Sequence, residues 1–513
     1  MKRTVALGLC CVTVILFQPL CTTAFETSTH RLINRQAASA LVLSDSGQTF
    51  DDFLRYQLLL PGGLDESLNG QTVLGWLGTG GVAEDQYMPE VLGQKLAEYA
   101  GGVTRSPRHF HTPLKDWEHS GLNLGGFQFE SSVRWAQLPD QGFTGKAAWG
   151  DARSTYFEAL TNSDPDERAR LFGDTFKILG QLMHLVADLG SVAHTRNAQH
   201  LLGDPFEEFV NEPINQSLIA GYQGMDPSYV RFTPTNDAVA TVPVARLWDT
   251  DTYNGSNPDV TAQLPGTPAT VGLAEFTSAN FFSRSTIAKI AGADPVLPYP
   301  AIDQLEPNLT PGPTGTQRQY LKKTGQGITI DHMVLESAFN LFEPSTWQRF
   351  SLDDKVFQDY AVELLPRAIG YSAGLIDYFF RGQLGAFEVS GGVPESCQPA
   401  RIVCLDVWNS TEGEETDGAG EVTLLVLCCW PTLDTFYVSA PVPITLTRER
   451  QMVSFTLNSV PPPGNGADYV FGGTYIIYRG PLGKEEGAVM FGGSICPVIF
   501  QTQWDFSYVN CFN

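Results

Sequence analysis

Cysteine is missing from most of this chain. The sequence has 513 residues, and none of those between positions 22 and 396 is a cysteine. A metal site in that stretch has to use nitrogen and oxygen ligands, because no thiolate is available there. The last part of the chain holds six cysteines: Cys397, Cys404, Cys428, Cys429, Cys496 and Cys511. An even number in an exported domain predicts disulfides, although their pairing does not follow from the sequence.

Basic residues are also scarce. Lys and Arg number 32 against 56 Asp and Glu, which gives a formal net charge of −24 at pH 7. A surface this acidic repels nucleic acid and anionic membranes at long range. Zwitterionic lipid or a small substrate is not repelled in this way, so the charge favours partners of those kinds.

Long apolar runs are absent after the N-terminus, so no later segment has the length that a membrane-spanning helix needs. The N-terminus itself has two basic residues, an apolar run from Val5 to Phe17, and small residues over Thr22–Ala24. This order is typical of a secretory signal peptide. We expect residues 1–24 to be removed, Phe25 to become the first residue, and the protein to be secreted to an extracellular or periplasmic location.

Residues 25–390 are expected to form a helical domain. The segment Ser163-Asp164-Pro165 is a typical helix start, and large apolar residues then recur at helical spacing up to Val186. Pro, Gly, Thr and Asn dominate residues 225–325, which predicts a loop-rich insertion with one helical segment around Gly272–Ile290. After the insertion, the apolar spacing predicts two more helices, at Leu335–Phe342 and Asp354–Phe380.

The pattern changes at Ser390–Pro394, where Gly and Pro interrupt the helical spacing. Beyond this point short apolar runs alternate with Gly, Pro and Asn turns. This alternation predicts a C-terminal antiparallel β-sandwich over residues 391–513, which would contain the expected disulfides. The predicted strands are Arg401–Val407, Glu421–Cys428, Val442–Leu446, Val453–Leu457, Tyr475–Tyr478 and Ala488–Phe491.

Histidine is a third scarce residue, yet three of the eight histidines lie close together in an apolar helical segment. His184 and Asp188 are four residues apart, so on a helix they project from the same face. Imidazole and carboxylate groups are the usual ligands of zinc and similar ions. His194 lies about 280° around an ideal helix from His184, at about 100° per residue, and is therefore expected to serve a neighbouring metal.

A second helix is expected to begin near Asp204-Pro205, a short loop after His200. Glu207 would then lie in the first turn of that helix, from where its carboxylate can meet the imidazole of His200. These residues extend the candidate metal site beyond the first helix.

The motif H-x3-D-x5-H at His184, Asp188 and His194 resembles the signature of the zinc-dependent phospholipase C / S1–P1 nuclease superfamily. Its members are exported, helical phosphodiesterases with three zinc ions. His200 and Glu207 resemble the next element of that pattern, although the spacing is H-x6-E where the family has H-x3-E. Asp204 stands at the family spacing and remains an alternative to Glu207.

Further upstream, His109 in the run HFHTP resembles the family context H-F-x-x-P, with His111 as the less favoured ligand. The family also has an aspartate before this histidine. Asp85 fits that place, although it lies 24 residues upstream, more than usual, and Glu84 competes with it.

The N-terminal element of the family binds zinc through the first residue's amino nitrogen and carbonyl oxygen and through a histidine shortly after it. Phe25 and His30 match that element, at the spacing of the nuclease branch. The resemblance thus implies up to three zinc ions held by nine residues: Phe25, His30, Asp85, His109, His184, Asp188, His194, His200 and Glu207.

The resemblance also implies roles. Asp188 would bridge two zinc ions, Asp85 would bind one of those two and is the candidate general base, and the third ion would lie with His194, His200 and Glu207. The expected fold is mainly α, a domain like zinc phospholipase C and P1 nuclease followed by the β-sandwich. We expect a metal-dependent hydrolase of phosphoric esters that acts on phospholipids.

Two alternatives stay open. The first is a nuclease or 3′-nucleotidase of the same superfamily, in which case nucleic acid becomes the partner. The second is a secreted binding protein without activity, in which zinc is structural. The C-terminal sandwich is expected to contact a membrane or another surface, by analogy alone.

Overall fold

The computed structural model describes most of the chain. The described ranges are residues 27–86, 105–142, 145–200, 203–222, 243–256, 271–287, 297–312, 315–325, 328–337, 349–389, 402–428, 435–459, 469–470, 473–495, 498–500 and 506–508. The predicted signal peptide and Phe25 lie outside these ranges. Among the described helices, none combines the length and the apolar content that crossing a membrane requires.

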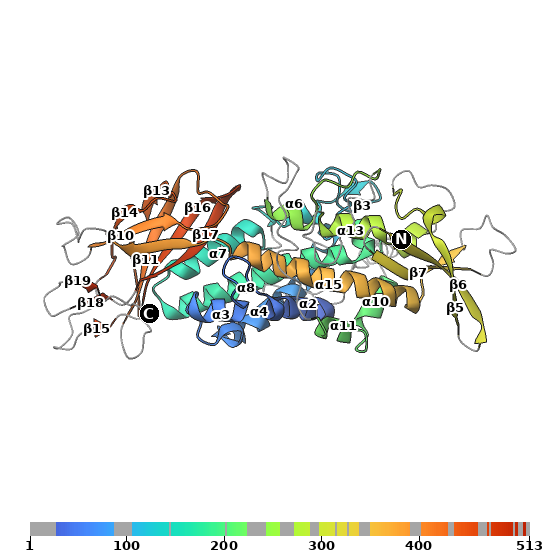
Figure 1. Ribbon diagram of the computed structural model, residues 1–513, viewed down its shortest axis with the longest axis horizontal. Coiled ribbons are helices and arrows are strands. Elements are labelled where there is room, and N and C mark those ends of the chain that lie inside the picture. The colour runs from blue at the N-terminus through green and yellow to red at the C-terminus, as the bar shows by residue number, and fades with distance from the viewer. Residues whose placement is uncertain are drawn as a thin grey trace, which may run out of the picture.

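Five helices form the centre of the molecule and pack side by side (Figure 1). Their buried faces share one large apolar core, which includes Leu182 and Leu364, both 0% exposed. The helices predicted to begin after Ser163 and to span Asp354–Phe380 are both present. The five are α2 (Thr27–Ala40), α4 (Val73–Gln86), α7 (Trp149–Thr161), α8 (Pro165–Ala187) and α15 (Asp354–Phe379).

Helices α4 and α8 approach each other closely because both carry glycine at their crossing. A Cβ on Gly80 would lie 2.1 Å from the carbonyl oxygen of Lys177, and one on Gly180 would lie 2.2 Å from that of Leu77. Asn34 of α2 ties the pair together, since its Nδ2 donates to the carbonyls of Leu77 at 3.0 Å and Gly180 at 2.9 Å. This contact places the last turn of α4 against α8.

Shorter helices surround this centre. The helical segment predicted around Gly272–Ile290 is present as two short helices, of which α13 is the longer. The short helices are α3 (Phe50–Tyr56), α6 (Ser132–Trp135), α9 (Val192–Thr195), α10 (Pro205–Asn211), α11 (Ser217–Ala220), α13 (Leu273–Asn280) and α14 (Arg284–Ile287). Two small hairpins are formed by β1 (Ser67–Leu68) with β2 (Gln71–Thr72) and by β3 (Asn123–Leu124) with β4 (Phe127–Gln128).

An antiparallel sheet corrects two predictions from the sequence. Its strands pair in the order β5-β6-β7-β8. The loops predicted over residues 225–325 are therefore wrong at 306–311 and 317–325, and the helix predicted over Leu335–Phe342 is wrong at its start, where Leu335 and Glu336 belong to a strand. Residues 338–342 lie outside the described residues. In β7 buried Ile328 and Ile330 alternate with exposed residues, which is the period of a strand. The strands are β5 (Glu306–Pro311), β6 (Gln317–Gly325), β7 (Ile328–Glu336) and β8 (Phe350–Ser351).

The C-terminal part is a sandwich of two antiparallel sheets, as predicted. One has the strand order β14-β10-β9, and the other has β12-β11-β16-β17 with β13 also on β11. Val403 and Leu405 of the first sheet share a buried core with Val422 and Ile476 of the second. The strands are β9 (Leu384–Glu388), β10 (Ile402–Asn409), β11 (Gly420–Cys428), β12 (Thr435–Val438), β13 (Val442–Ile444), β14 (Gln451–Thr456), β16 (Gly473–Leu482) and β17 (Glu485–Ile495).

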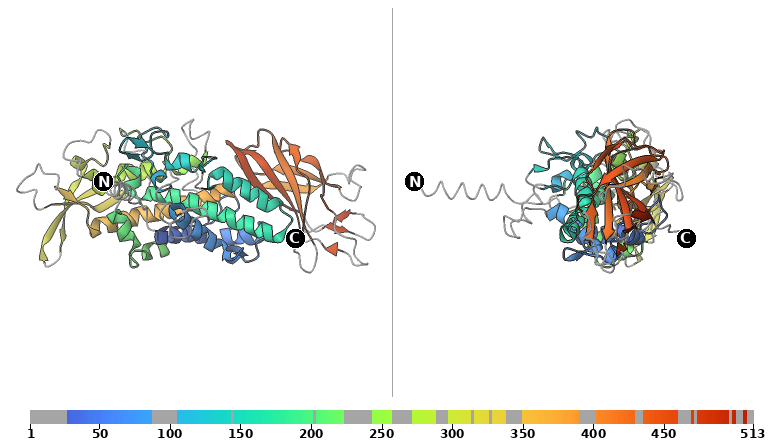
Figure 2. Two further views of the ribbon diagram at one scale, coloured as in Figure 1. Left: turned by 180° about the vertical axis from the view of Figure 1, so that it is seen from behind. Right: turned by 90° about the vertical axis from the view of Figure 1, so that its left-hand side faces the viewer.

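All six strands predicted for this region are therefore present, together with β9 and β12, which the sequence did not indicate. A further small sheet is formed by β15 (Tyr469–Val470), β18 (Val498–Phe500) and β19 (Phe506–Tyr508). The sandwich lies at one end of the elongated molecule and the β5–β8 sheet at the other, with the helices between them (Figure 2). The division into domains at residue 390 and the disulfides stay predictions.

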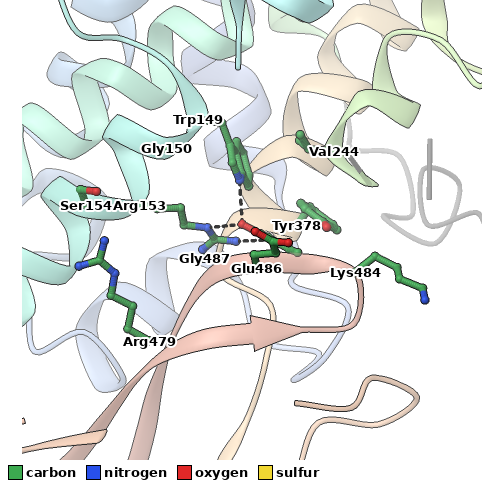
Figure 3. A pocket seen from close by; sticks show the side chains of 11 residues that line it. Trp149, Gly150, Arg153, Ser154, Val244, Tyr378, Arg479, Lys484, Glu486 and Gly487 are labelled. Carbon is green, nitrogen blue, oxygen red and sulfur yellow. Dashed lines mark hydrogen bonds and ion pairs between the residues drawn. The ribbon is translucent and has the colours of Figure 1, made fainter. Parts of the chain in front are cut away.

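One buried carboxylate joins the sandwich to the helices. Glu485, at the start of β17, accepts hydrogen bonds from Trp149 Nε1 at 2.7 Å and Arg153 Nε at 2.8 Å. Both donors belong to α7, and Figure 3 shows their side chains beside the cavity. It also accepts from Arg381 Nη1 at 2.6 Å, just beyond the end of α15. The two parts of the molecule are thus held by a charged network beside a cavity of about 340 Å³.

Candidate metal centre

Helix α8 presents the first two residues of the centre. It begins where the sequence predicts, because the side chain of Asp164 accepts the backbone N–H groups of Asp166 and Glu167. The α-helix ends at Ala187, and a 3₁₀ turn starts at Asp188. One turn apart, His184 Nε2 and Asp188 Oδ2 lie 3.2 Å from each other, both fully buried.

Asp188 is surrounded by imidazoles from three separate segments. Its Oδ1 lies 2.9 Å from His30 Nε2 of α2, and its Oδ2 lies 3.0 Å from His109 Nδ1. His184 completes the set, and all of these side chains are 0% exposed. A carboxylate with ring nitrogens on both of its oxygens has the arrangement of a bridging metal ligand.

The described residues contain three groups of side chains whose ligand atoms lie within 4.8 Å of one another. Two of these groups share His184, and one of those two also contains Asp85 of α4. Asp85 Oδ1 lies 3.6 Å from His109 Nδ1 and 3.8 Å from His184 Nε2. The groups are His30 with His184 and Asp188, Asp85 with His109 and His184, and His194 with His200 and Glu207.

The third group forms between α9 and the start of α10. Glu207 Oε1 lies 3.5 Å from His194 Nε2, and its Oε2 lies 3.7 Å from His200 Nε2. Ser191 Oγ donates to Glu207 Oε1 at 2.6 Å and fixes that carboxylate. The chain leaves the α-helix before His194, so the 280° expected for an ideal helix does not apply, yet His194 still joins a different group from His184.

The structure separates Asp85 from its competitor Glu84. Glu84 accepts hydrogen bonds from Arg105, Trp135 and Gln181, the last two at 3.0 and 2.9 Å. Burial acts to raise the pKa of Glu84, but Arg105 outweighs it and lowers that pKa. Glu84 is therefore engaged in a structural ion pair, while both carboxylate oxygens of Asp85 lack a hydrogen-bond partner.

The other two alternatives also have partners elsewhere. His111 Nε2 lies 2.8 Å from Asp249 Oδ2, and its Nδ1 lies 3.1 Å from Ser120 Oγ, so both ring nitrogens are used. Asp204 caps α10 by accepting the N–H of Phe206 at 2.9 Å. Burial, with the charge of Glu207, raises the pKa of Asp204 to about 6. Neither residue belongs to the three groups.

Two imidazoles are oriented by backbone carbonyls. His184 Nδ1 lies 2.6 Å from the carbonyl oxygen of Gly81, and His200 Nδ1 lies 2.8 Å from that of Ala198. A ring that donates from Nδ1 presents the lone pair of Nε2, which is how many metal-binding histidines are held. The carbonyl of Gly81 and the ion pair of Glu84 were not predicted from the sequence. The run of glycines at 78, 80 and 81 is the one signal that could have indicated a close helix approach here.

The buried polar atoms of the centre fit a set of divalent cations. Atoms without a hydrogen bond in the structure include both oxygens of Asp85, Nε2 of His109 and Oε2 of Glu207. Burying such groups without partners is costly, and such groups are usually paired or bound to metal. A donor set of imidazole nitrogens and carboxylate oxygens is suited to zinc.

The pKa values show how strongly these groups influence one another. Burial acts to lower the pKa of His184, but the carboxylates of Asp188 and Asp85 outweigh it and raise that pKa to about 10. Burial lowers the pKa of His30 to about 3 and that of His109 to about 4. The pKa of Asp85 rises to about 7, chiefly through burial. The free centre therefore holds protons that a cation would have to displace.

Comparison with known proteins finds no matching family model and no matching curated protein. Among solved structures, the alpha-toxin of Clostridium perfringens from avian strain SWCP is 10% identical, with 93% of this chain and 98% of that chain covered and a TM-score of 0.25. The alpha toxin of Clostridium absonum is 11% identical, with the same coverage and TM-score. A likeness with a TM-score of 0.25 carries no conclusion about function.

Proposed function

We propose that this protein is a secreted, zinc-dependent phosphodiesterase that hydrolyses phospholipids in the manner of a phospholipase C. The observation that supports the proposal is the contiguous set of three buried histidine–carboxylate groups around Asp188. A structural zinc site is typically a single closed tetrahedron. Three adjoining groups, two of which share His184, are instead typical of a polynuclear site for phosphoryl chemistry.

The proposed ligands are those implied by the sequence. The first ion would lie with His30, His184 and Asp188, together with the backbone of Phe25, which signal cleavage would place at the N-terminus. The second ion would lie with Asp85 and His109, and Asp188 would bridge it to the first, since Asp188 Oδ2 lies 3.0 Å from His109 Nδ1. The third ion would lie with His194, His200 and Glu207. Export and processing are then conditions for activity.

Zinc ions in such a centre would bind the phosphoryl oxygens and lower the pKa of the attacking water. The chain contributes the geometry. Asp188 holds its two oxygens toward different groups, and Ser191 fixes the carboxylate of Glu207. Asp85, whose oxygens have no hydrogen-bond partner, is the proposed general base that accepts the proton of the water.

A phospholipid substrate agrees with the acidic surface, because a zwitterionic headgroup is not repelled as a polyanion is. We also propose that the sandwich contacts the lipid surface. Phe387 and Met452 are both paired across strands with Asp406, so all three share one face of the β14-β10-β9 sheet. Phe387 is 47% exposed and Met452 51%, which leaves large apolar groups on that face.

The test uses protein that is secreted with its own signal, so that the processed N-terminus is present, and that is loaded with zinc. We expect two to three zinc ions per chain and release of phosphocholine from phosphatidylcholine in mixed micelles. Single-stranded DNA is the competing substrate. Asp188→Asn should abolish turnover, because it removes the charge that joins two groups.

Asp116→Asn is the matched control, since Asp116 also pairs with a histidine, His119, at 2.6 Å but on the surface. Its activity should equal that of the unchanged protein. Absence of bound zinc would refute the metal centre. Bound zinc with cleavage of DNA alone would assign the nuclease activity instead, and zinc without turnover of either substrate would indicate a structural role. An added residue before Phe25 should lower activity if the N-terminus binds zinc.

A further inference from the structure

A second histidine–aspartate pair lies buried next to the metal centre without belonging to it. His111 Nε2 is 2.8 Å from Asp249 Oδ2, and both side chains are 0% exposed. Ser120 Oγ lies 3.1 Å from the other ring nitrogen. The imidazole of His111 is therefore held from two sides and cannot rotate without losing a buried hydrogen bond.

His111 is joined through its backbone to the third metal group. Its N–H donates to the carbonyl oxygen of His194 at 3.0 Å. In return, His194 Nδ1 lies 3.3 Å from the carbonyl oxygen of His109. Residues 109–111 and α9 are thus linked by reciprocal hydrogen bonds. The first segment carries His109 of the second metal group, and α9 carries His194 of the third.

The loop that follows Asp249 is held by a buried carboxylate, and the N–H of Asp251 donates to Asp249 Oδ1 at 2.7 Å. Glu275 of α13 accepts the backbone N–H groups of Thr250 at 2.9 Å, and of Thr252 and Tyr253 at 2.8 Å. It also accepts the N–H of Gly272 at 2.6 Å. Because these amides donate to one buried carboxylate, the backbone of residues 250–253 is fixed. This fixes the position of Asp249, whose side chain contacts His111.

We infer that Asp249 is a positioning residue that, through His111, sets the separation between the second and third metal groups. The inference rests on the proposed metal centre. It assigns a positioning role to residues 249–253 and Glu275, which are not among the proposed metal ligands. The group formed by His30, His184 and Asp188 has no contact with this pair among the described residues. It shares His184 with the second group, so its metal affinity should depend on Asp249 less than that of the other two groups.

The experiment measures metal retention by the processed protein during titration with a chelator, and the visible spectrum after cobalt replaces zinc. Asp249→Ala should release the ions of the second and third groups at a chelator concentration about 10- to 100-fold lower, the usual effect of losing a partner that orients a ligand. The ion of the first group, whose ligands have no direct contact with Asp249 or His111 among the described residues, should be affected least. The cobalt spectrum should change because the ligand geometry changes.

Asp249→Asn provides a second variant that keeps the size and a hydrogen-bonding group, in case the alanine variant does not fold. Its ions of the second and third groups should also be released at a lower chelator concentration, by a smaller factor than in Asp249→Ala. The control is Asp359→Asn, because Asp359 Oδ2 of α15 lies 3.1 Å from His332 Nδ1 of β7 in a partly exposed histidine–aspartate pair outside the three metal groups. Its metal retention and cobalt spectrum should equal those of the unchanged protein.

Three results would overturn the inference. If Asp249→Asn retains all ions as tightly as the unchanged protein, with the same cobalt spectrum, Asp249 has no positioning role although the metal centre stands. If all three groups lose metal together, the effect is a general loss of structure. If the unchanged protein binds no metal, the proposed function fails as well, and this is seen before any variant is made.

Discussion

The role of the Glu485 carboxylate in joining the sandwich to the helices can be tested by a substitution that changes only its charge. Glu485→Gln keeps the shape of the side chain but removes the negative charge between Arg153 and Arg381. The arginine side chains are 4% and 2% exposed, and Glu485 is 9% exposed, so water can replace little of the lost interaction. Removing one partner of a buried pair is costly because it leaves the other charges unpaired.

The pKa of Glu485 gives the magnitude. Burial acts to raise this pKa, but Arg153 and Arg381 outweigh it and lower it from 4.5 to about 2. A fall of that size corresponds to roughly 3 kcal/mol, at about 1.4 kcal/mol for each pH unit. The folded pKa is depressed, so this stabilisation is complete above the unfolded value near 4.5 and is lost as the pH falls toward 2.

The assay is urea unfolding of the chelator-treated protein at pH 7, 5 and 3, so that metal loss in acid does not contribute. We expect the free energy of unfolding of Glu485→Gln to be about 3 kcal/mol lower than that of the unchanged protein at pH 7. The difference should remain at pH 5 and shrink at pH 3. The control is Glu486→Gln, the exposed neighbour, which should change stability by less than about 0.5 kcal/mol.

Equal stability of the two proteins at pH 7 would contradict this reasoning. A difference that persisted unchanged to pH 3 would also contradict it, because the loss could then not arise from the charge of Glu485.

Two further predictions concern the centre and the helices that carry it. Gly80→Ala should lower the free energy of unfolding by about 1–3 kcal/mol in thermal or urea unfolding, because the new methyl group meets the backbone of Lys177. Gly150→Ala, with nothing within 4 Å of the added carbon, should be neutral, and equal effects of the two would refute the role of the crossing. Zinc binding should release protons near pH 7, since carboxylates hold the pKa of His184 at about 10, so apparent affinity should rise with pH in this range. Calorimetry in buffers of different ionisation enthalpy measures this release, and heats independent of the buffer would show that no proton leaves.

Local patterns were sufficient for several elements. The start of α8 follows from Asp164-Pro165, and the start of α10 from Asp204-Pro205, because an N-cap acts within a few residues. The strands of the sandwich follow from short apolar runs separated by Gly, Pro and Asn turns. The sheet from β5 to β8 was missed because exposed strands rich in polar residues have a weak apolar pattern, as in β5, where no residue is buried.

The sequence by itself determined which side chains were available as ligands. Histidine and carboxylate spacing indicated eight described residues that the fold gathers into three groups, while Phe25 lies outside the described residues. Cysteine was excluded from the start by its absence. These conclusions depend only on residue type and on short distances along the chain.

The tertiary structure decided which of two neighbouring carboxylates faces the centre. Glu84 and Asp85 are adjacent, and spacing cannot separate them. The buried guanidinium of Arg105 occupies Glu84, and the glycine crossing of α4 and α8 brings Asp85 to His184. Likewise, only the fold could join Asp249 to His111 across more than a hundred residues. Such choices depend on which charges become buried together, and that is set by packing between segments that are distant in the sequence.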